Sequence, residues 1–294
     1  MCMKFPFQNL SQNLSDDPAR RGEYAMHSIV LAALLSIVPV VAVAEPPDVM
    51  TLVKQVKAAF EPSQPTVRKV EISLHAENKA TTWHAAQAFK PTPAGNQMLT
   101  VLLEPAEIRA NAFVVREQAE EVSGMWIYSP LTRRVREFVP VDAYERFLGT
   151  DFTYADSGLI RLHEHYRLLD KEQHHGVQAY KIEEQIKGQR HYYSRIFIWV
   201  TTDSMLPLER EYFDLSEHIW KRERFWHGAG VHGLPSLLRT TMEDVQAKTW
   251  TSLIVTEERV AIPIPDEVFD PKKLPTVASH PIWLTPVTAG PHEQ

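Results

Sequence analysis

Histidine is the residue type in this sequence with the most obvious capacity for chemistry, and the chain contains 13 of them. Three pairs lie close together along the chain: His163 and His165, His174 and His175, and His227 and His232. A zinc site needs three or four ligands, and the spacings that usually supply them, His-Glu-x-x-His and Cys-x-x-Cys, are absent. We therefore expect hydrogen-bonded or exposed histidines, no metal site and no cofactor.

Other catalytic groupings are equally weak. The chain has no Gly-x-Ser-x-Gly nucleophile elbow, and its one cysteine is Cys2. The pairs Glu183-Glu184 and Glu257-Glu258 each put one carboxylate on either face of a strand, so neither forms a facing acid–base pair. The sequence predicts that the protein is not an enzyme.

Arginine gathers in one short region, at Arg133, Arg134, Arg136 and Arg146. These side chains have two interpretations. They form cross-strand salt bridges with Glu137 and Asp142, or Arg133, Arg134 and Arg136 present their guanidinium groups to the phosphate of a lipid headgroup.

The arginines lie on a predicted β-hairpin. Residues 125–128 form a β-prone run in which Trp126 and Tyr128 share one face, while Met125 and Ile127 share the other. Proline at position 130 interrupts this run, because it cannot donate to a ladder, and a second alternating run covers 133–139.

An aromatic loop follows the hairpin at residues 146–156. Phe147, Leu148, Phe152 and Tyr154 lie here without helical or strand periodicity, and Gly149 and Asp151 mark the segment as a loop. Such a loop must bury its rings. It either plugs the end of its own sheet or forms a flap over an apolar cavity, with Gly149 as the point where the gate bends.

Hairpin and loop together resemble the LolA-like family of outer-membrane lipoprotein-sorting proteins. The hairpin matches the pattern W-x-Y-x-P-x-x-R-x-V-R, and the loop matches F-x-G-[ST]-D-F-[ST]-Y-x-D, with Thr150 where serine is usual. Further matches follow at 198–200, 206–208, 211–214 and 266–269, so the resemblance covers nearly all of the chain after residue 45.

The resemblance implies an incomplete antiparallel β-barrel with helices covering an apolar cavity. It also implies a carrier that moves lipids or lipoprotein acyl chains through the periplasm, with an inner-membrane lipid exporter of the resistance-nodulation type as a candidate partner. Two alternatives remain open: a periplasmic sensor that binds a lipid or peptide, and a metal-dependent enzyme built on the histidines.

The beginning of the chain is typical of a signal peptide. An apolar run over 29–41 ends in Ala42-Val43-Ala44, a small-x-small cleavage site, and is short for a membrane span. We expect cleavage after Ala44 and export to the periplasm, with Met26 as an alternative start.

The net charge of the chain is −6. The sequence therefore lacks the excess of basic residues that is typical of proteins that bind nucleic acid.

After this segment the pattern predicts one helix and then many strands. Asp48 can cap a helix whose apolar stripe comprises Val49, Leu52, Val53, Val56 and Phe60. Period-two alternation then predicts strands near 67–76, 81–89, 97–104, 112–118, 124–129, 133–139, 164–172, 177–186, 193–201, 207–213, 217–226, 236–244 and 248–260. Only short helical pieces are expected besides, near 141–148 and 155–163.

The predicted fold is therefore mainly β: a single half-open antiparallel barrel over residues 45–274, covered by the N-terminal helix and by short helices and loops. Residues 275–294 are expected to be a flexible proline-rich tail, apart from a possible docking of residues 282–284. Some strands are apolar on both faces, as at 195–200, and few helices are available to cover them. We expect a lipid cavity lined by Trp126, Tyr128, Phe147, Phe152, Tyr154 and Trp199.

Overall fold

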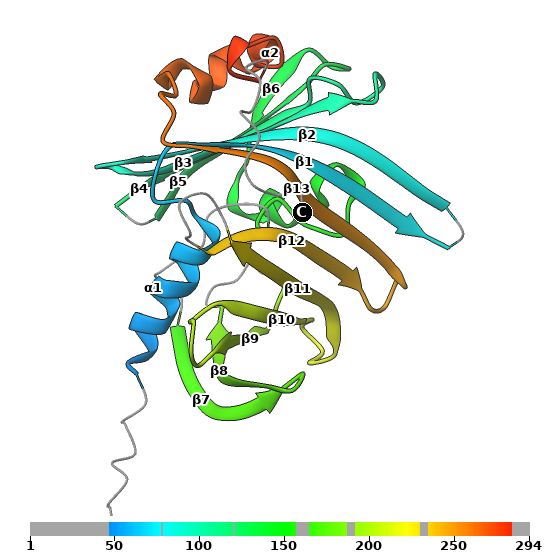
Figure 1. The fold of residues 1–294 in the computed structure, drawn as a ribbon. Coiled ribbons are helices and arrows are strands. Elements are labelled where there is room, and N and C mark those ends of the chain that lie inside the picture. The colour runs from blue at the N-terminus through cyan, green and yellow to red at the C-terminus, as the bar shows by residue number, and fades with distance from the viewer. Residues whose placement is uncertain are drawn as a thin grey trace, which may run out of the picture. The chain divides into compact units, whose positions relative to one another are not determined.

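Thirteen antiparallel strands form one sheet in the computed structural model of the chain (Figure 1). The structure describes residues 47–77, 79–119, 121–156, 165–186, 192–229 and 235–283. Every strand prediction is confirmed, since each predicted range overlaps a strand, although some strands extend past the predicted limits. The predicted signal peptide, His163, His232 and the end of the tail lie outside the described residues.

The first half of the sheet is a meander of six strands. They are β1 (Thr66–Ala76), β2 (Lys79–Thr92), β3 (Gly95–Glu104), β4 (Ala112–Gln118), β5 (Glu121–Ser129) and β6 (Arg134–Glu137). The predicted hairpin is β5–β6, in which Trp126 pairs with Glu137 and Tyr128 with Val135.

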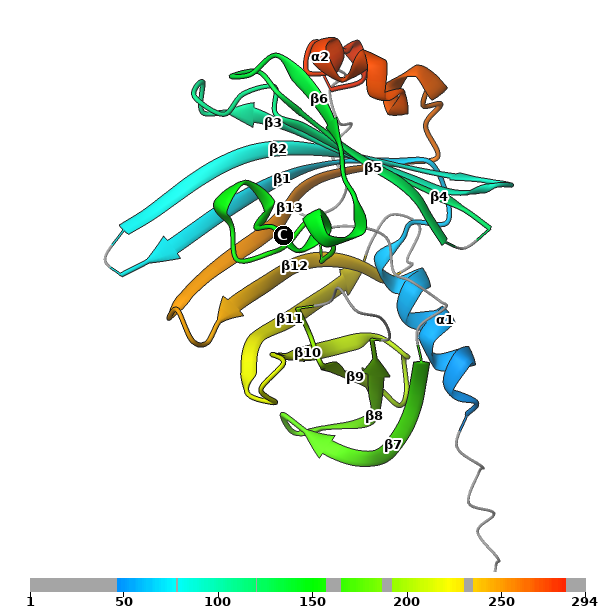
Figure 2. The ribbon, with the colours of Figure 1, turned by 180° about the vertical axis from the view of Figure 1, so that it is seen from behind.

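The second half is a meander of seven strands. They are β7 (His165–His174), β8 (Val177–Gln185), β9 (Arg195–Thr201), β10 (Pro207–Phe213), β11 (Ile219–Ala229), β12 (Pro235–Asp244) and β13 (Thr249–Val260). The pairing of β1 with β13 joins the two halves, so that β6 and β7 become the opposite edges of the sheet. The sheet is strongly curved and does not close (Figures 1 and 2). This is the predicted half-open barrel.

Helix α1 (Val49–Phe60) begins as predicted, with the Asp48 carboxylate accepting a hydrogen bond from the backbone N–H of Thr51 at 3.0 Å. Its buried residues Leu52, Val53 and Val56 pack with the largest core cluster, as the predicted stripe requires. Among the described residues, no helix is long and apolar enough to cross a bilayer.

The segment between β6 and β7 has to connect opposite edges of the sheet. Its described part carries two 3₁₀ turns, Pro140–Tyr144 and Phe147–Gly149, and lies within the curve of the sheet (Figure 2). Here Phe147, Phe152 and Tyr154 join the core cluster that also contains α1. The chain thus covers one face of the sheet because its topology sends it across.

The C-terminal segment covers the opposite face. It contains 3₁₀ turns at Asp266–Phe269, Pro271–Lys273 and Pro281–Trp283 and the short helix α2 (Leu274–Val277). Val277, Ile282 and Trp283 are buried with Leu274 in a second cluster, and the Trp283 indole N–H donates to the Val277 carbonyl at 2.6 Å. Packing of the chain against the sheet therefore continues to Trp283.

Candidate functional site

A cavity of about 110 Å³ lies between the concave face of the sheet, the end of α1 and the aromatic loop. Its apolar lining is Phe60, Ile72, Phe89, Met98, Phe147, Phe152, Phe225, Leu237, Leu253 and Val255. Its polar lining is Glu61, Arg68, Gln87, Thr100, Thr150, Asp156, Arg210, Glu223 and Thr240. The space is therefore amphipathic, with side chains from both halves of the sheet.

Arg210 on β10 is a cation of the cavity lining that contacts two aromatic rings. Its guanidinium carbon lies 4.6 Å from the centre of the Phe60 ring and 5.6 Å from that of Phe225, and one of its nitrogens is 3.6 Å from Glu223. Its Nε atom is buried and has no hydrogen-bond partner. A buried donor of this kind can serve an acceptor on a bound molecule.

Glu223 on β11 balances this cation. It accepts hydrogen bonds from the Tyr212 hydroxyl at 2.5 Å and the Thr240 hydroxyl at 3.2 Å. Burial raises the pKa of the Glu223 carboxyl, although the Arg210 charge opposes the shift. The polar wall is therefore a connected network and not a set of isolated charges.

Arg68 on β1 supplies a second cation at the cavity. Its Nε donates to Glu258 at 2.6 Å, and its guanidinium lies 5.3 Å from the centre of the Phe89 ring. Both cavity arginines thus stack on aromatic rings, which holds their planar groups in a fixed direction.

The aromatic loop is tied to the sheet at two acidic residues. Asp151 is buried and accepts hydrogen bonds from the hydroxyls of Thr249 at 2.5 Å and Thr251 at 2.7 Å, both on β13. Asp156 accepts from the Tyr193 hydroxyl at 3.1 Å and lies 3.3 Å from the buried ammonium of Lys221 on β11. These bonds hold Phe147 and Phe152 over the cavity.

Backbone geometry explains the glycine in this loop. Gly149 has φ +87°, a left-handed conformation that side chains rarely adopt, and Leu148 before it has φ 51°. The Thr150 hydroxyl closes the turn by donating to the Phe147 carbonyl at 2.7 Å. Serine or threonine can make this bond, which accounts for either residue type at this position of the motif.

Three comparisons place this architecture among known proteins. A protein-family model whose description reads "Uncharacterized protein" matches residues 94–276, more than half of the chain. The chain belongs to that family. Among the curated proteins, none matches the sequence.

Solved structures share the fold at low sequence identity. An outer membrane lipoprotein-sorting protein domain from Vibrio parahaemolyticus has a TM-score of 0.71 at 18% identity, covering 77% of this chain and 97% of that chain. A DUF1329 family protein from Desulfovibrio piger has a TM-score of 0.69 at 21% identity, covering 76% and 97%. A LolA superfamily protein from Nitrosomonas europaea has a TM-score of 0.62 at 16% identity, covering 76% and 98%. The fold is LolA-like, as the sequence motifs predicted.

Within the LolA-like fold, some of the residues predicted to line the cavity lie at it and others lie elsewhere. Phe147 and Phe152 line the cavity, and Tyr154 packs behind them, with its ring centre 5.2 Å from that of Phe147. Burial raises the pKa of the Tyr154 hydroxyl to about 12. The aromatic loop therefore contributes two rings to the cavity lining and a third ring behind them.

Trp126, Tyr128 and Trp199 do not line it. On β5 the alternation puts Met125 and Ile127 in the cluster with α1, whereas Trp126 and Tyr128 pack under the C-terminal segment on the other face. Trp199 likewise faces away from its neighbours Ile198 and Val200, and stacks on His174 at 4.3 Å. The expected placement of these three aromatics fails because alternation distinguishes two faces without indicating which one is concave.

The hairpin arginines are also remote from the cavity lining. Arg133 and Arg134 are exposed at the β5–β6 turn. Arg136 pairs with Glu145 at 2.8 Å and Asp142 at 3.4 Å, and Asp142 is one of the two partners that the salt-bridge interpretation named. The arginines that reach the cavity are Arg68 and Arg210. A sequence signal that could have found Arg210 is the mixture of charged and aromatic residues in β10.

Proposed function

We propose that the protein is a periplasmic carrier that binds a lipid or lipoprotein acyl chain in the cavity under the aromatic loop. The observation that supports this most directly is the amphipathic cavity between loop, α1 and sheet. Its apolar part suits methylene groups, and Arg68 and Arg210 suit the polar end or linkage of the same molecule.

The volume of the cavity indicates how an acyl chain would enter it. About 110 Å³ is small beside the roughly 300–1,000 Å³ of pockets that hold drug-sized ligands. A full acyl chain therefore requires the loop or α1 to move outward, and the residues that separate are Phe147 and Phe152 on the loop and Phe60 on α1. Each methylene transferred from water contributes about 0.8 kcal/mol, which can offset the lost loop contacts.

The carrier hypothesis extends to location and partners. Export after removal of residues 1–44 would put the protein between two membranes, where an acyl chain needs a cover from water. The candidate donor is an inner-membrane lipid exporter of the resistance-nodulation type, which rests on the family resemblance alone. We propose a binding role and no catalytic one.

Displacement of a dansyl-labelled fatty acid, with circular dichroism on the same samples, tests this proposal. Leu253→Trp adds a large side chain to the cavity wall and should weaken binding by about tenfold or more. Phe152→Ala should mainly speed release, because it removes a ring from the cover.

Trp199→Ala provides the matched control, since it removes a buried aromatic from the face opposite to the cavity. It should leave binding of the fatty acid near the wild-type level. A folded Leu253→Trp protein that binds as tightly as the wild type would overturn the proposal, and so would a wild-type protein that binds no fatty acid.

A further inference from the structure

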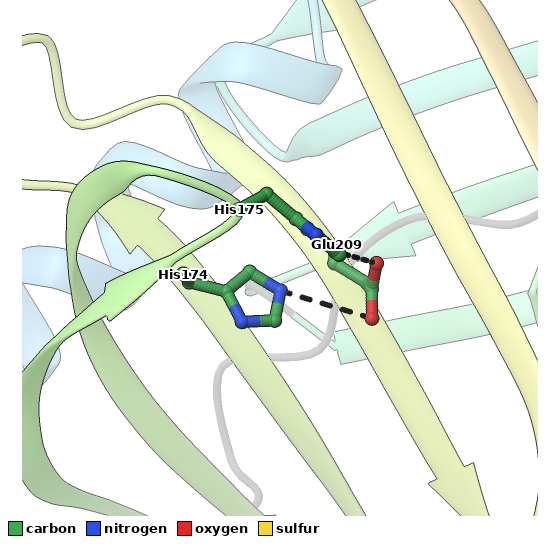
Figure 3. Close-up of side chains that lie close together, drawn as sticks. All are labelled: His174, His175 and Glu209. Carbon is green, nitrogen blue, oxygen red and sulfur yellow. Dashed lines mark hydrogen bonds and ion pairs between the residues drawn. The ribbon is translucent and has the colours of Figure 1, made fainter.

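The structure brings together three side chains that the sequence keeps apart: His174 at the end of β7, His175 in the β7–β8 turn, and Glu209 on β10 (Figure 3). Their ligand atoms lie within 4.8 Å of one another. His175 Nε2 is 2.9 Å from one Glu209 oxygen, and His174 Nε2 is 3.7 Å from the other. From this geometry we propose that His174, His175 and Glu209 bind a divalent transition-metal ion of the zinc type.

The separations suit a metal ion. Two ligands with bonds of about 2.0–2.2 Å to a tetrahedral zinc lie about 3.4 Å apart, and the two measured separations fall on either side of that value. Two imidazoles and one carboxylate form a familiar ligand set for zinc and leave a fourth position for water.

His174 provides a second, independent observation. Its Nε2 atom is buried without a hydrogen-bond partner, and it is directed at Glu209 from a distance too long for a hydrogen bond. Stacking on Trp199 at 4.3 Å, with an angle of 11° between the rings, fixes its orientation.

Glu209 is a preorganised ligand in spite of its cationic neighbours. Its side chain is only 3% exposed, and it lies 2.9 Å from Arg224 and 3.3 Å from Arg222. These guanidinium groups hold the carboxylate in a fixed position, while its two oxygens retain further lone pairs for a metal. The same positive charges should hold the affinity for a cation at a moderate level.

A metal ion bound at this cluster would link the edge hairpin β7–β8 to β10. Glu209 pairs in the sheet with Trp199 on β9, and Trp199 pairs with Lys181 on β8. The β7–β8 turn therefore reaches across one strand, β9, to Glu209 at the curled end of the sheet (Figure 1). A metal ion here would fasten the edge hairpin to β10 on the face opposite to the lipid cavity. This inference is thus independent of the proposed carrier role.

Calorimetric titration of the tag-free, chelator-treated protein with Zn²⁺ tests the proposal. We expect one ion per chain and a rise in the melting temperature on binding. His175→Asn alters an exposed side chain, and asparagine tolerates the φ of 50° found there, so this variant should fold. It should weaken Zn²⁺ binding by about tenfold or more, and His174→Gln/His175→Asn should abolish it.

His218→Gln is the control, because His218 is exposed and lies outside the cluster. Cobalt(II) offers a second readout, since visible absorption bands of a four-coordinate ion should appear with the wild type and disappear with the double variant. Absence of Zn²⁺ binding to the wild type would overturn the proposal. Equal binding by wild type and the folded double variant would do the same.

Discussion

Individual residues in this protein carry charge into places where strand residues are usually apolar. On β11, Lys221, Glu223 and Phe225 alternate on the cavity side, and all three are buried. Lys221 is matched by Asp156 of the aromatic loop, and Glu223 by Arg210. Burying such charges costs free energy unless each has a partner of opposite charge. The concave face therefore carries paired charges among its apolar side chains.

His227, on the same strand, makes the stability of the fold depend on pH. Burial lowers its pKa to about 4 from an ordinary value near 6.5. The unfolded chain then binds the proton more readily, so stability is fully present above pH 6.5 and is lost as the pH falls toward 4. After allowance for the partial exposure of the His227 side chain, the free energy of unfolding falls by an amount on the order of 2 kcal/mol.

Urea denaturation between pH 7 and pH 4 measures this effect. His227→Gln should flatten the dependence in that window, whereas His218→Gln, at an exposed position, should leave it unchanged. An unaltered pH profile in the His227 variant would show that other groups are responsible.

At the scale of elements, the aromatic loop is the part that decides access to the cavity. It is bonded to β13 through Asp151 and to β11 through Asp156, so it is an anchored cover and not a free flap. Opening therefore requires specific polar bonds to break before the aromatic rings can separate. The loop motif of the sequence combines the rings of the cover with the carboxylates that fasten it.

Asp151→Ala tests this anchoring. It removes the acceptor of the Thr249 and Thr251 hydroxyls and should destabilise the fold by about 1–3 kcal/mol. Amide hydrogen exchange of residues 147–156 should accelerate more than exchange in β1 or β13. Asp170→Ala, at an exposed edge-strand position, should change neither quantity, and uniform acceleration in the Asp151 variant would argue against a local anchor.

At the scale of the whole molecule, the pairing of the first and last strands determines the architecture. The contact between β1 and β13 converts two meanders into one sheet and sends the intervening segment across its concave face. The cavity therefore exists only when both halves are in place, because Arg68 comes from the first half and Arg210 from the second. We expect the sheet to unfold cooperatively as one unit.

The compact unit that contains the sheet begins at Pro46, next to the cleavage site predicted after Ala44. Processing there would remove no residue of the sheet or of α1. Sequencing of the protein from a periplasmic extract should give an N-terminus at Glu45. A mature chain that retains residues 29–41 would contradict the signal-peptide prediction.

The sequence by itself determined the local elements of this protein. Asp48 and the apolar stripe behind it specify α1, alternation specifies each strand, and Pro130 marks the turn of the β5–β6 hairpin. These features depend on residues close together in the chain, where backbone geometry and side-chain period act directly. The aromatic loop was found in the same way, because its lack of periodicity is itself local.

The tertiary structure decided which face is which and which distant residues meet. Alternation separates Trp126 from Ile127 on β5, but only the direction of the sheet's curvature puts Ile127 on the concave side. Arg68 and Arg210 converge on one cavity because β1 pairs with β13, a contact between sequence ends that no local period encodes. His174 and Glu209 meet for a related reason, since the order of the strands in the sheet brings the β7–β8 hairpin close to β10.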